Sequence, residues 1–359
     1  MALSNILRKH LPWTQEPLII NAPMSGAAAS ELAIAVTLAG GLGQIGFMNN
    51  IQSLSKQLES ARRGLQGVTK ILPNPQVLPI GLGIIVFGSA VEEWISLFAQ
   101  YKPAVVWLSF ASADEFGAWT EGIRRASPDT KVWVQVGSVT AAVAVAEACH
   151  PDALVLQGSD AGGHGHKDGA NVISLIPEVA DVLREHGIND IPLVAAGGIV
   201  DGRGSAAALV LGASGVVMGT RFLAATETRV PDAYRDAIFN AWDGASTTVR
   251  SRVFDAIWGP NFWPIAYDGR CLRNKVYEEH QKGIAVDRIR AWHYGAMREG
   301  GTEPLEARDV VGIWAGTGVG LVKTLANAGD IVREVREDTK TRLSTAACLC
   351  NPIRVQGSP

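Results

Sequence analysis

Residues 153–166, ALVLQGSDAGGHGH, join a short apolar run to a loop that contains four glycines and two histidines. We expect residues 153–157 to form a buried strand, because the run is short, continuous and apolar. The glycines that follow allow backbone N–H groups to approach a ligand closely. His164 lies between two of these glycines, and an imidazole titrates near neutral pH, as a general base requires. The stretch therefore predicts one wall of a cofactor site, with His164 as the candidate base.

Similar apolar runs recur along the first 220 residues, and a helical pattern follows most of them. We expect strands at 18–24, 42–47, 78–87, 104–110, 131–136, 153–157, 191–196 and 215–220. We expect helices at 30–38, 51–65, 91–100, 113–125, 140–149, 173–185 and 204–211, with Ser30 as an N-cap. The alternation predicts an α/β protein, a closed (β/α)8 TIM barrel of parallel strands. A doubly wound open sheet is the competing fold.

The alternation of strands and helices stops after Arg221, which divides the chain. Residues 1–225 and 302–345 are expected to form the barrel, with a helical pattern at 309–335. Residues 226–301 are rich in aromatic and charged side chains and predict a mostly helical insertion over the C-terminal face of the barrel. Residues 346–359 are expected to be a tail without an assignable role.

The composition narrows the classes of partner. A formal net charge of -3 gives no electrostatic reason to expect nucleic acid or an anionic membrane surface. No apolar run is long enough for a signal peptide or a membrane span. The four cysteines show no spacing typical of a metal site, which favours free thiols in a reducing, cytoplasmic compartment. We therefore expect a small-molecule substrate, and a homodimer stays open.

The active site of such a barrel lies where the strands end. Gly198, Gly219 and Thr220 follow the last two strands, and their N–H groups predict a phosphate site, with simple tight turns as the alternative. Gln135 and Gln157 end strands five and six and suit the polar edge of a flavin, with loop-capping amides as the alternative. The other residues at strand ends are Ala22, Pro23, Met24, Gly197 and Met218.

The sequence argues against nucleotide and metal sites of the common kinds. The chain lacks a P-loop, and no Gly-x-Gly-x-x-Gly follows the first strand, which argues against ATP and a Rossmann dinucleotide site. His164 and His166 have no third ligand nearby in the sequence, so no metal is expected. His166 is expected at the surface or behind the site, and Asp160 is expected to shape the turn or to modulate His164.

Four motifs resemble those of the nitronate monooxygenases. They are Ala22-Pro-Met24, Gln157-Gly-Ser-Asp-Ala-Gly-Gly-His164, Ala195-Ala-Gly-Gly-Ile199 and Met218-Gly-Thr-Arg-Phe222, with looser similarity at 252–255 and 268–270. The resemblance implies an FMN-dependent barrel that oxidises alkyl nitronates with O2 to a carbonyl compound and nitrite. It implies single-electron transfer from the nitronate to FMN before the reaction with O2.

The resemblance also assigns roles to residues. His164 matches the catalytic histidine, which removes the α-proton when the substrate is a neutral nitroalkane. The flavin-contacting positions match Gln157, Gly162, Gly198 and the turn Val217, Met218, Gly219 and Thr220, and Ala22 to Met24 would lie beside the isoalloxazine. Asp160 stands where the family often has Glu, and Gly81 and Gly83 stand where bacterial members have an Asn, so the substrate preference stays open.

Other functions fit the same barrel and histidine loop. The chain is also similar to flavin-dependent enoyl-acyl carrier protein reductases and quinone reductases, which reduce the flavin with NAD(P)H. A flavin-binding protein without turnover, or a specialised tailoring enzyme of a biosynthetic pathway, is a further alternative. Reduction of the flavin by NAD(P)H or by nitronate distinguishes these functions.

Overall fold

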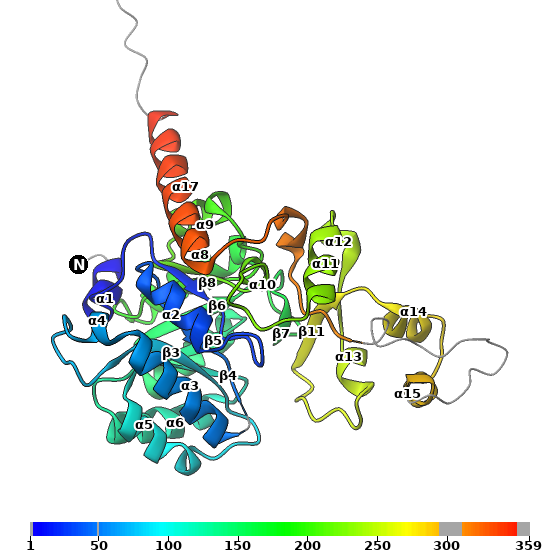
Figure 1. Cartoon of the computed structure of the whole chain (residues 1–359), viewed down its shortest axis with the longest axis horizontal. Coiled ribbons are helices and arrows are strands. Elements are labelled where there is room, and N and C mark those ends of the chain that lie inside the picture. Colours follow the sequence, from blue (N-terminus) through cyan, green and yellow to red (C-terminus); the bar gives the residue numbers. More distant parts are fainter. Residues whose placement is uncertain (1–2, 49, 294–310, 350–359) are drawn as a thin grey trace, which may run out of the picture.

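A computed structural model describes residues 3–48, 50–293 and 311–349 (Figure 1). Its main sheet has eight parallel strands in the order β1-β9-β8-β6-β5-β4-β3-β2. They are β1 (Ile19–Asn21), β2 (Gln44–Ile45), β3 (Leu78–Ile85), β4 (Pro103–Ser109), β5 (Lys131–Val136), β6 (Ala153–Gln157), β8 (Leu193–Ala196) and β9 (Gly215–Met218). A bridge between Ile20 and Leu42 joins β1 to the segment before β2 and closes the ring. The predicted barrel is therefore confirmed, and the open sheet is wrong.

Helices surround this ring on the outside (Figure 1). They are α2 (Ser30–Leu38), α3 (Ile51–Gly64), α4 (Gln66–Thr69), η1 (Val91–Glu93), α5 (Ile95–Tyr101), α6 (Ala113–Ala126), α7 (Val139–Cys149), α8 (Val172–Glu185) and α9 (Gly202–Val210). The short helix α10 (Thr220–Leu223) follows β9 directly and is buried. The expected N-cap at Ser30 is wrong. Ala29 is the N-cap of α2, and the Ser30 hydroxyl instead donates to Gln57 Oε1.

The core has two layers because successive side chains of a strand point to opposite faces. On β4, Val105 and Trp107 belong to the cluster inside the barrel, whereas Val106 and Leu108 belong to the cluster between the strands and the helices. Leu7, on helix α1 (Leu3–His10), is buried in the inner cluster with residues at the starts of strands. The amino end of the barrel is thus filled, and the opposite end is left for a site.

The region after β9 contains strands that its aromatic and charged composition did not predict. Its elements are α11 (Asp232–Asn240), α12 (Gly244–Thr247), β10 (Thr248–Ser251), α13 (Val253–Ala256), β11 (Tyr267–Leu272), α14 (Lys275–Gln281) and α15 (Val286–His293). Strand β11 pairs antiparallel with β10 on one side and with β7 (Gly163–His166) on the other. The second half of the glycine loop is therefore a strand of this second sheet. Residues 294–301 of the expected insertion lie outside the described residues.

The helical pattern expected at 309–335 is correct only at its end. Residues 311–327 contain the short 3-10 helix η2 (Thr317–Leu321), and the long helix α17 runs over Ala328–Leu349. Gly316 has an extended backbone, and a Cβ there would lie 2.4 Å from the Asp160 carbonyl oxygen, so this segment packs closely against the glycine loop. Helix α17 also continues into the expected tail, and residues 309–310 and 350–359 lie outside the described residues. The buried Arg336 of α17 donates to the carbonyls of Ala39 and Gly40.

No helix among the described residues is long and apolar enough to span a membrane.

Candidate active site

A cavity of about 470 Å³ opens at the carboxyl ends of the barrel strands. Most of the residues predicted for the site line it: Ala22, Pro23, Met24, Gln135, Gln157, Gly162, His164, Gly197, Gly198, Val217, Gly219 and Thr220. Met218 is the exception. Its side chain is fully buried in the outer layer of the core, because neighbouring residues on β9 face opposite sides.

The two glutamines form one hydrogen-bonded chain at the ends of β5 and β6. Gln135 Nε2 donates to Gln157 Oε1 over 3.0 Å, and Gln157 Nε2 donates to the carbonyl of His164 over 3.0 Å. This fixes the orientation of the Gln157 amide. Each amide keeps a further N–H, and Gln135 keeps its carbonyl oxygen, so the pair can still bind the polar edge of a ligand.

Glycine is required at the turn after β8. Gly197 and Gly198 have φ angles of +114° and +74°, and a Cβ on Gly197 would lie 2.9 Å from the carbonyl oxygen of Gly158. Within the described residues, the N–H groups of Gly198 and Gly219 donate to no other group of the chain. Free N–H groups at neighbouring strand ends form a cradle for an anion such as a phosphate.

No lysine, arginine, aspartate or glutamate side chain lines the described part of the cavity. The walls are mostly apolar, and the polar groups are the two glutamines, two serines, Thr220, His164 and Tyr234. A flat, largely apolar ring with a hydrogen-bonding edge and one phosphate fits this set of donors and acceptors. The residues present therefore fit a flavin mononucleotide.

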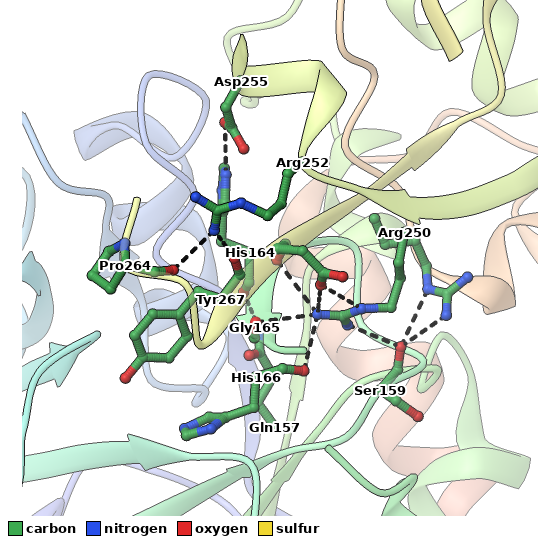
Figure 2. A network of polar contacts seen from close by, with 12 residues as sticks. Gln157, Ser159, His164, Gly165, His166, Arg250, Arg252, Asp255, Pro264 and Tyr267 are labelled. Atoms are coloured by element: carbon green, nitrogen blue, oxygen red, sulfur yellow. Dashed lines mark hydrogen bonds and ion pairs between the residues drawn. The ribbon is translucent and has the colours of Figure 1, made fainter. Parts of the chain in front are cut away.

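His164 is held by residues that are distant in the sequence. Its backbone pairs with Gly269 of β11, and its Nε2 lies 2.8 Å from Asp255 Oδ1 (Figure 2). Its ring stacks on Trp263, with ring centroids 3.7 Å apart and planes 6° apart. Trp314 packs against it at 4.6 Å between centroids. The flanking glycines gave no sign of these partners, and none of them was predicted from the sequence.

Two arginines hold the glycine loop in shape, and Figure 2 labels one of them, Arg250. Arg250 donates to the carbonyls of Ser159, Gly165 and His166 and pairs with Asp268. Arg270 donates to the same Ser159 carbonyl. Both arginines come from the second sheet, so this sheet determines the shape of a loop that belongs to the barrel.

A third arginine holds the segment that carries Trp263. Arg252 donates to the carbonyls of Trp263, Pro264 and Tyr267. Trp263 is half-buried over His164, whereas its neighbour Phe262 is 81% exposed. The indole is therefore directed into the cavity by a loop whose backbone is fixed.

His166 and Asp160 lie behind the cavity rather than in it. His166 packs against Tyr267, with centroids 5.0 Å apart, and both burial and the nearby Arg250 guanidinium lower its pKa. It is half-buried, which agrees with a place behind the site and not with one at the surface. The Asp160 side chain lies beside Gly198 and makes no hydrogen bond among the described residues. The backbone carbonyl of Asp160 accepts the N–H of Thr317. Asp255, not Asp160, is the acid that contacts His164.

Tyr234 of α11 lines the cavity and was not predicted from the sequence. Its hydroxyl oxygen accepts the N–H of Trp314 over 2.6 Å, and burial raises its pKa well above the ordinary value. The phenol therefore keeps its proton and can donate it to a ligand. The aromatic composition of residues 226–301 was the only signal in the sequence for Tyr234 and Trp263.

The comparisons with known proteins point to one family. The family model described as nitronate monooxygenase matches residues 9–338. The nitronate monooxygenase npaC of Metarhizium robertsii is 44% identical over 348 residues, which cover 94% of this chain and 95% of that protein. A nitronate monooxygenase of Neurospora crassa is 37% identical over 361 residues, which cover 94% of this chain and 93% of that protein.

Solved structures agree over most of the chain. FabK from Thermotoga maritima has a TM-score of 0.69 and 25% sequence identity, covering 96% of this chain and 98% of that chain. Nitroalkane oxidase from Streptomyces ansochromogenes has a TM-score of 0.65 and 25% identity, covering 92% of this chain and 98% of that chain.

Proposed function

Because this chain belongs to the nitronate monooxygenase family, a family of flavin-dependent oxidoreductases, we propose that it oxidises alkyl nitronates with O2 to a carbonyl compound and nitrite. The reaction balances when two nitronates and one O2 give two carbonyl compounds and two nitrites. The C=N bond of each nitronate breaks and a C=O bond forms. The observation that carries the proposal is His164, which faces a cavity beside two glycine turns with free N–H groups.

We propose that the flavin is FMN. The N–H groups of Gly198, Gly219 and Thr220 would hold its phosphate, and Gln135 and Gln157 would bind the polar edge of its ring. Ala22 to Met24, Gly162 and the turn at 217–220 would complete the contacts. When bound, the flavin accepts electrons from the nitronate and makes them available to O2.

His164 would act on substrates that still carry the α-proton. A neutral nitroalkane must lose this proton before it can be oxidised as a nitronate, and a nearby imidazole can accept it. The rings of Trp263, Trp314 and Phe110 around His164 make this side of the cavity largely apolar. A preformed nitronate does not need the base, so the two substrates separate proton removal from oxidation.

We also propose that residues 226–301 form a lid over the barrel of residues 1–225 and 302–345. The contacts of Trp263 and Asp255 with His164 support this division. A cytoplasmic location remains part of the proposal, and cell fractionation tests it.

The test is an anaerobic titration of the purified, flavin-loaded protein while the flavin spectrum is followed. An alkyl nitronate should bleach the flavin, NADPH should not, and the flavin released by denaturation should be FMN. Bleaching by NADPH with no effect of nitronate would instead indicate a flavin reductase. A flavin that responds to neither would indicate binding without turnover.

A His164→Asn variant tests the base. It should keep its FMN and its activity on preformed nitronate but lose activity on the neutral nitroalkane by about 100-fold, the usual contribution of a general base. Full activity on the neutral nitroalkane would overturn the assignment.

A further inference from the structure

His164 and Asp255 form a pair between the barrel and the second sheet with its helices. His164 lies on β7, directly after the barrel strand β6, and Asp255 lies on α13, 91 positions away in the chain. Nε2 of the imidazole is 2.8 Å from Oδ1 of the carboxylate, and the two side chains are 14% and 13% exposed. We infer that Asp255 is a positioning residue that keeps the proton of His164 on Nε2 and leaves Nδ1 to accept the α-proton of the substrate. The inference deepens the proposed function and rests on it.

The stacked indole explains why a second group is needed. Trp263 fixes the plane of the imidazole, because the two ring planes are only 6° apart. A half-turn about the Cβ–Cγ bond would keep that plane and exchange the nitrogen and carbon edges of the ring. The Asp255 carboxylate distinguishes these orientations, since it can accept a hydrogen bond from Nε2–H but would face a ring carbon after the half-turn. Plane and orientation are therefore set by two different side chains.

The other ring nitrogen is left for the substrate. Within the described residues, Nδ1 of His164 makes no hydrogen bond, and this atom is not fully buried. It is therefore reached by solvent, and His164 lines the cavity. A neutral imidazole that donates from one nitrogen accepts at the other. The geometry thus leaves a proton acceptor on the cavity side.

A contribution to the stability of the fold does not by itself explain why the Asp255 carboxylate is buried at this position. Oδ2 of Asp255 is buried and has no hydrogen-bond partner among the described residues, although buried polar atoms are normally paired. Two arginines that contact the ends of helix α13 are directed elsewhere. Arg252 donates to carbonyls of the Trp263 segment, and Arg290 donates to the carbonyls of Ala256, Ile257 and Gly259. His164 is the only described ionic partner of Asp255.

The first experiment measures the tautomer directly and does not depend on activity. Histidine-selective 15N labelling of the full-length protein, with His164→Asn to assign the signal, reports which nitrogen of His164 carries the proton. We expect the neutral form to be protonated on Nε2. A neutral form protonated on Nδ1 in the wild-type protein would overturn the inference, whether or not the protein turns over a nitronate.

The second experiment separates positioning from packing. Asp255→Asn and Asp255→Ala are compared with Asp236→Asn, an exposed aspartate of α11. We expect the Asp255 variants to lose at least about tenfold in kcat/KM for a neutral nitroalkane while their activity on preformed nitronate stays within about twofold. Asp236→Asn should match the wild type on both substrates.

Each outcome of this comparison is decisive. Equal losses on both substrates, or no loss on either, would overturn the positioning role. If the wild type fails with nitronate, the proposed function is wrong, and the 15N measurement still tests the tautomer. If an Asp255 variant does not fold, as judged by circular dichroism, the wild-type 15N signal alone decides.

Discussion

The imidazole of His164 and the indole of Trp263 lie in nearly parallel planes, with their centroids 3.7 Å apart. The histidine belongs to a loop of the barrel, and the tryptophan belongs to the region after the last barrel strand. The candidate base therefore has its full set of contacts only when these two parts of the chain pack together.

Replacing Trp263 by alanine should reduce activity without unfolding the protein. A stacked aromatic pair contributes about 1 kcal/mol, which corresponds to roughly a fivefold fall in kcat/KM for a neutral nitroalkane. Trp263→Phe should retain most of the activity, because it preserves a stacking ring. Phe262→Ala is the control, since that neighbouring side chain is 81% exposed. Steady-state kinetics on a nitroalkane measure the difference, and a Phe262 variant as impaired as Trp263→Ala would contradict the stacking role.

Replacing Gln157 by leucine should weaken flavin binding and loosen the glycine loop. The change removes the acceptor of Gln135 and leaves the His164 carbonyl without its donor. A buried polar group left unpaired costs about 1–3 kcal/mol, and the thermal midpoint should fall accordingly. The flavin content after gel filtration and the melting temperature check this prediction. Unchanged values of both would mean that the amide is dispensable.

A methyl group at position 162 should disturb the contact between the glycine loop and the segment before η2. A Cβ on Gly162 would lie 2.5 Å from the backbone of Ala315 and Gly316, and backbone cannot rotate away as a side chain can. We expect Gly162→Ala to destabilise the fold by about 1–3 kcal/mol and to lower flavin occupancy. Gly67→Ala is the matched control, because its Cβ would meet no atom within 4 Å. Urea unfolding of the two variants should show a loss only for position 162.

The pKa of His166 should make stability fall on mild acidification. Burial and the Arg250 guanidinium lower this pKa from 6.5, so the unfolded chain binds a proton that the folded protein does not. The free energy of unfolding should therefore decrease as the pH falls from 6.5 through the folded pKa, and this contribution is fully present above 6.5. His166→Gln should flatten that part of the curve. The pKa of His10 is lowered as well, so only the difference between variant and wild type isolates His166. Identical urea-unfolding curves against pH would contradict the prediction.

The sequence was most informative where neighbouring residues decide the structure. Strand β6 has the predicted bounds, residues 153–157, because an uninterrupted apolar run suits a strand covered on both faces. The residues that line the cavity could also be predicted, because the carboxyl ends of the strands of a barrel converge on one site. The Met218 side chain faces away from the cavity, because two adjacent residues of a strand point to opposite sides.

Strands β10 and β11 were missed because their charged residues hide the pattern. Arg250 and Asp268 pair with each other inside the sheet, so the strands look polar in the sequence although the ion pair is largely buried. Asp255 and Trp263 were missed for another reason. Their contacts with His164 depend on the folding of a region without a periodic pattern, and no local rule places them beside a distant loop.

Backbone pairing between strands β7 and β11 holds the candidate base beside the region that carries its partners. His164 lies opposite Gly269, and Gly163 lies opposite Arg270. Since a shift of one residue in such a ladder reverses the face of every side chain, residues 226–301 are not an exchangeable module. A chimera that takes this segment from a relative can bring new aromatic walls to the pocket. It will keep a working base only if the transplanted strand meets the recipient's glycine loop in the same register.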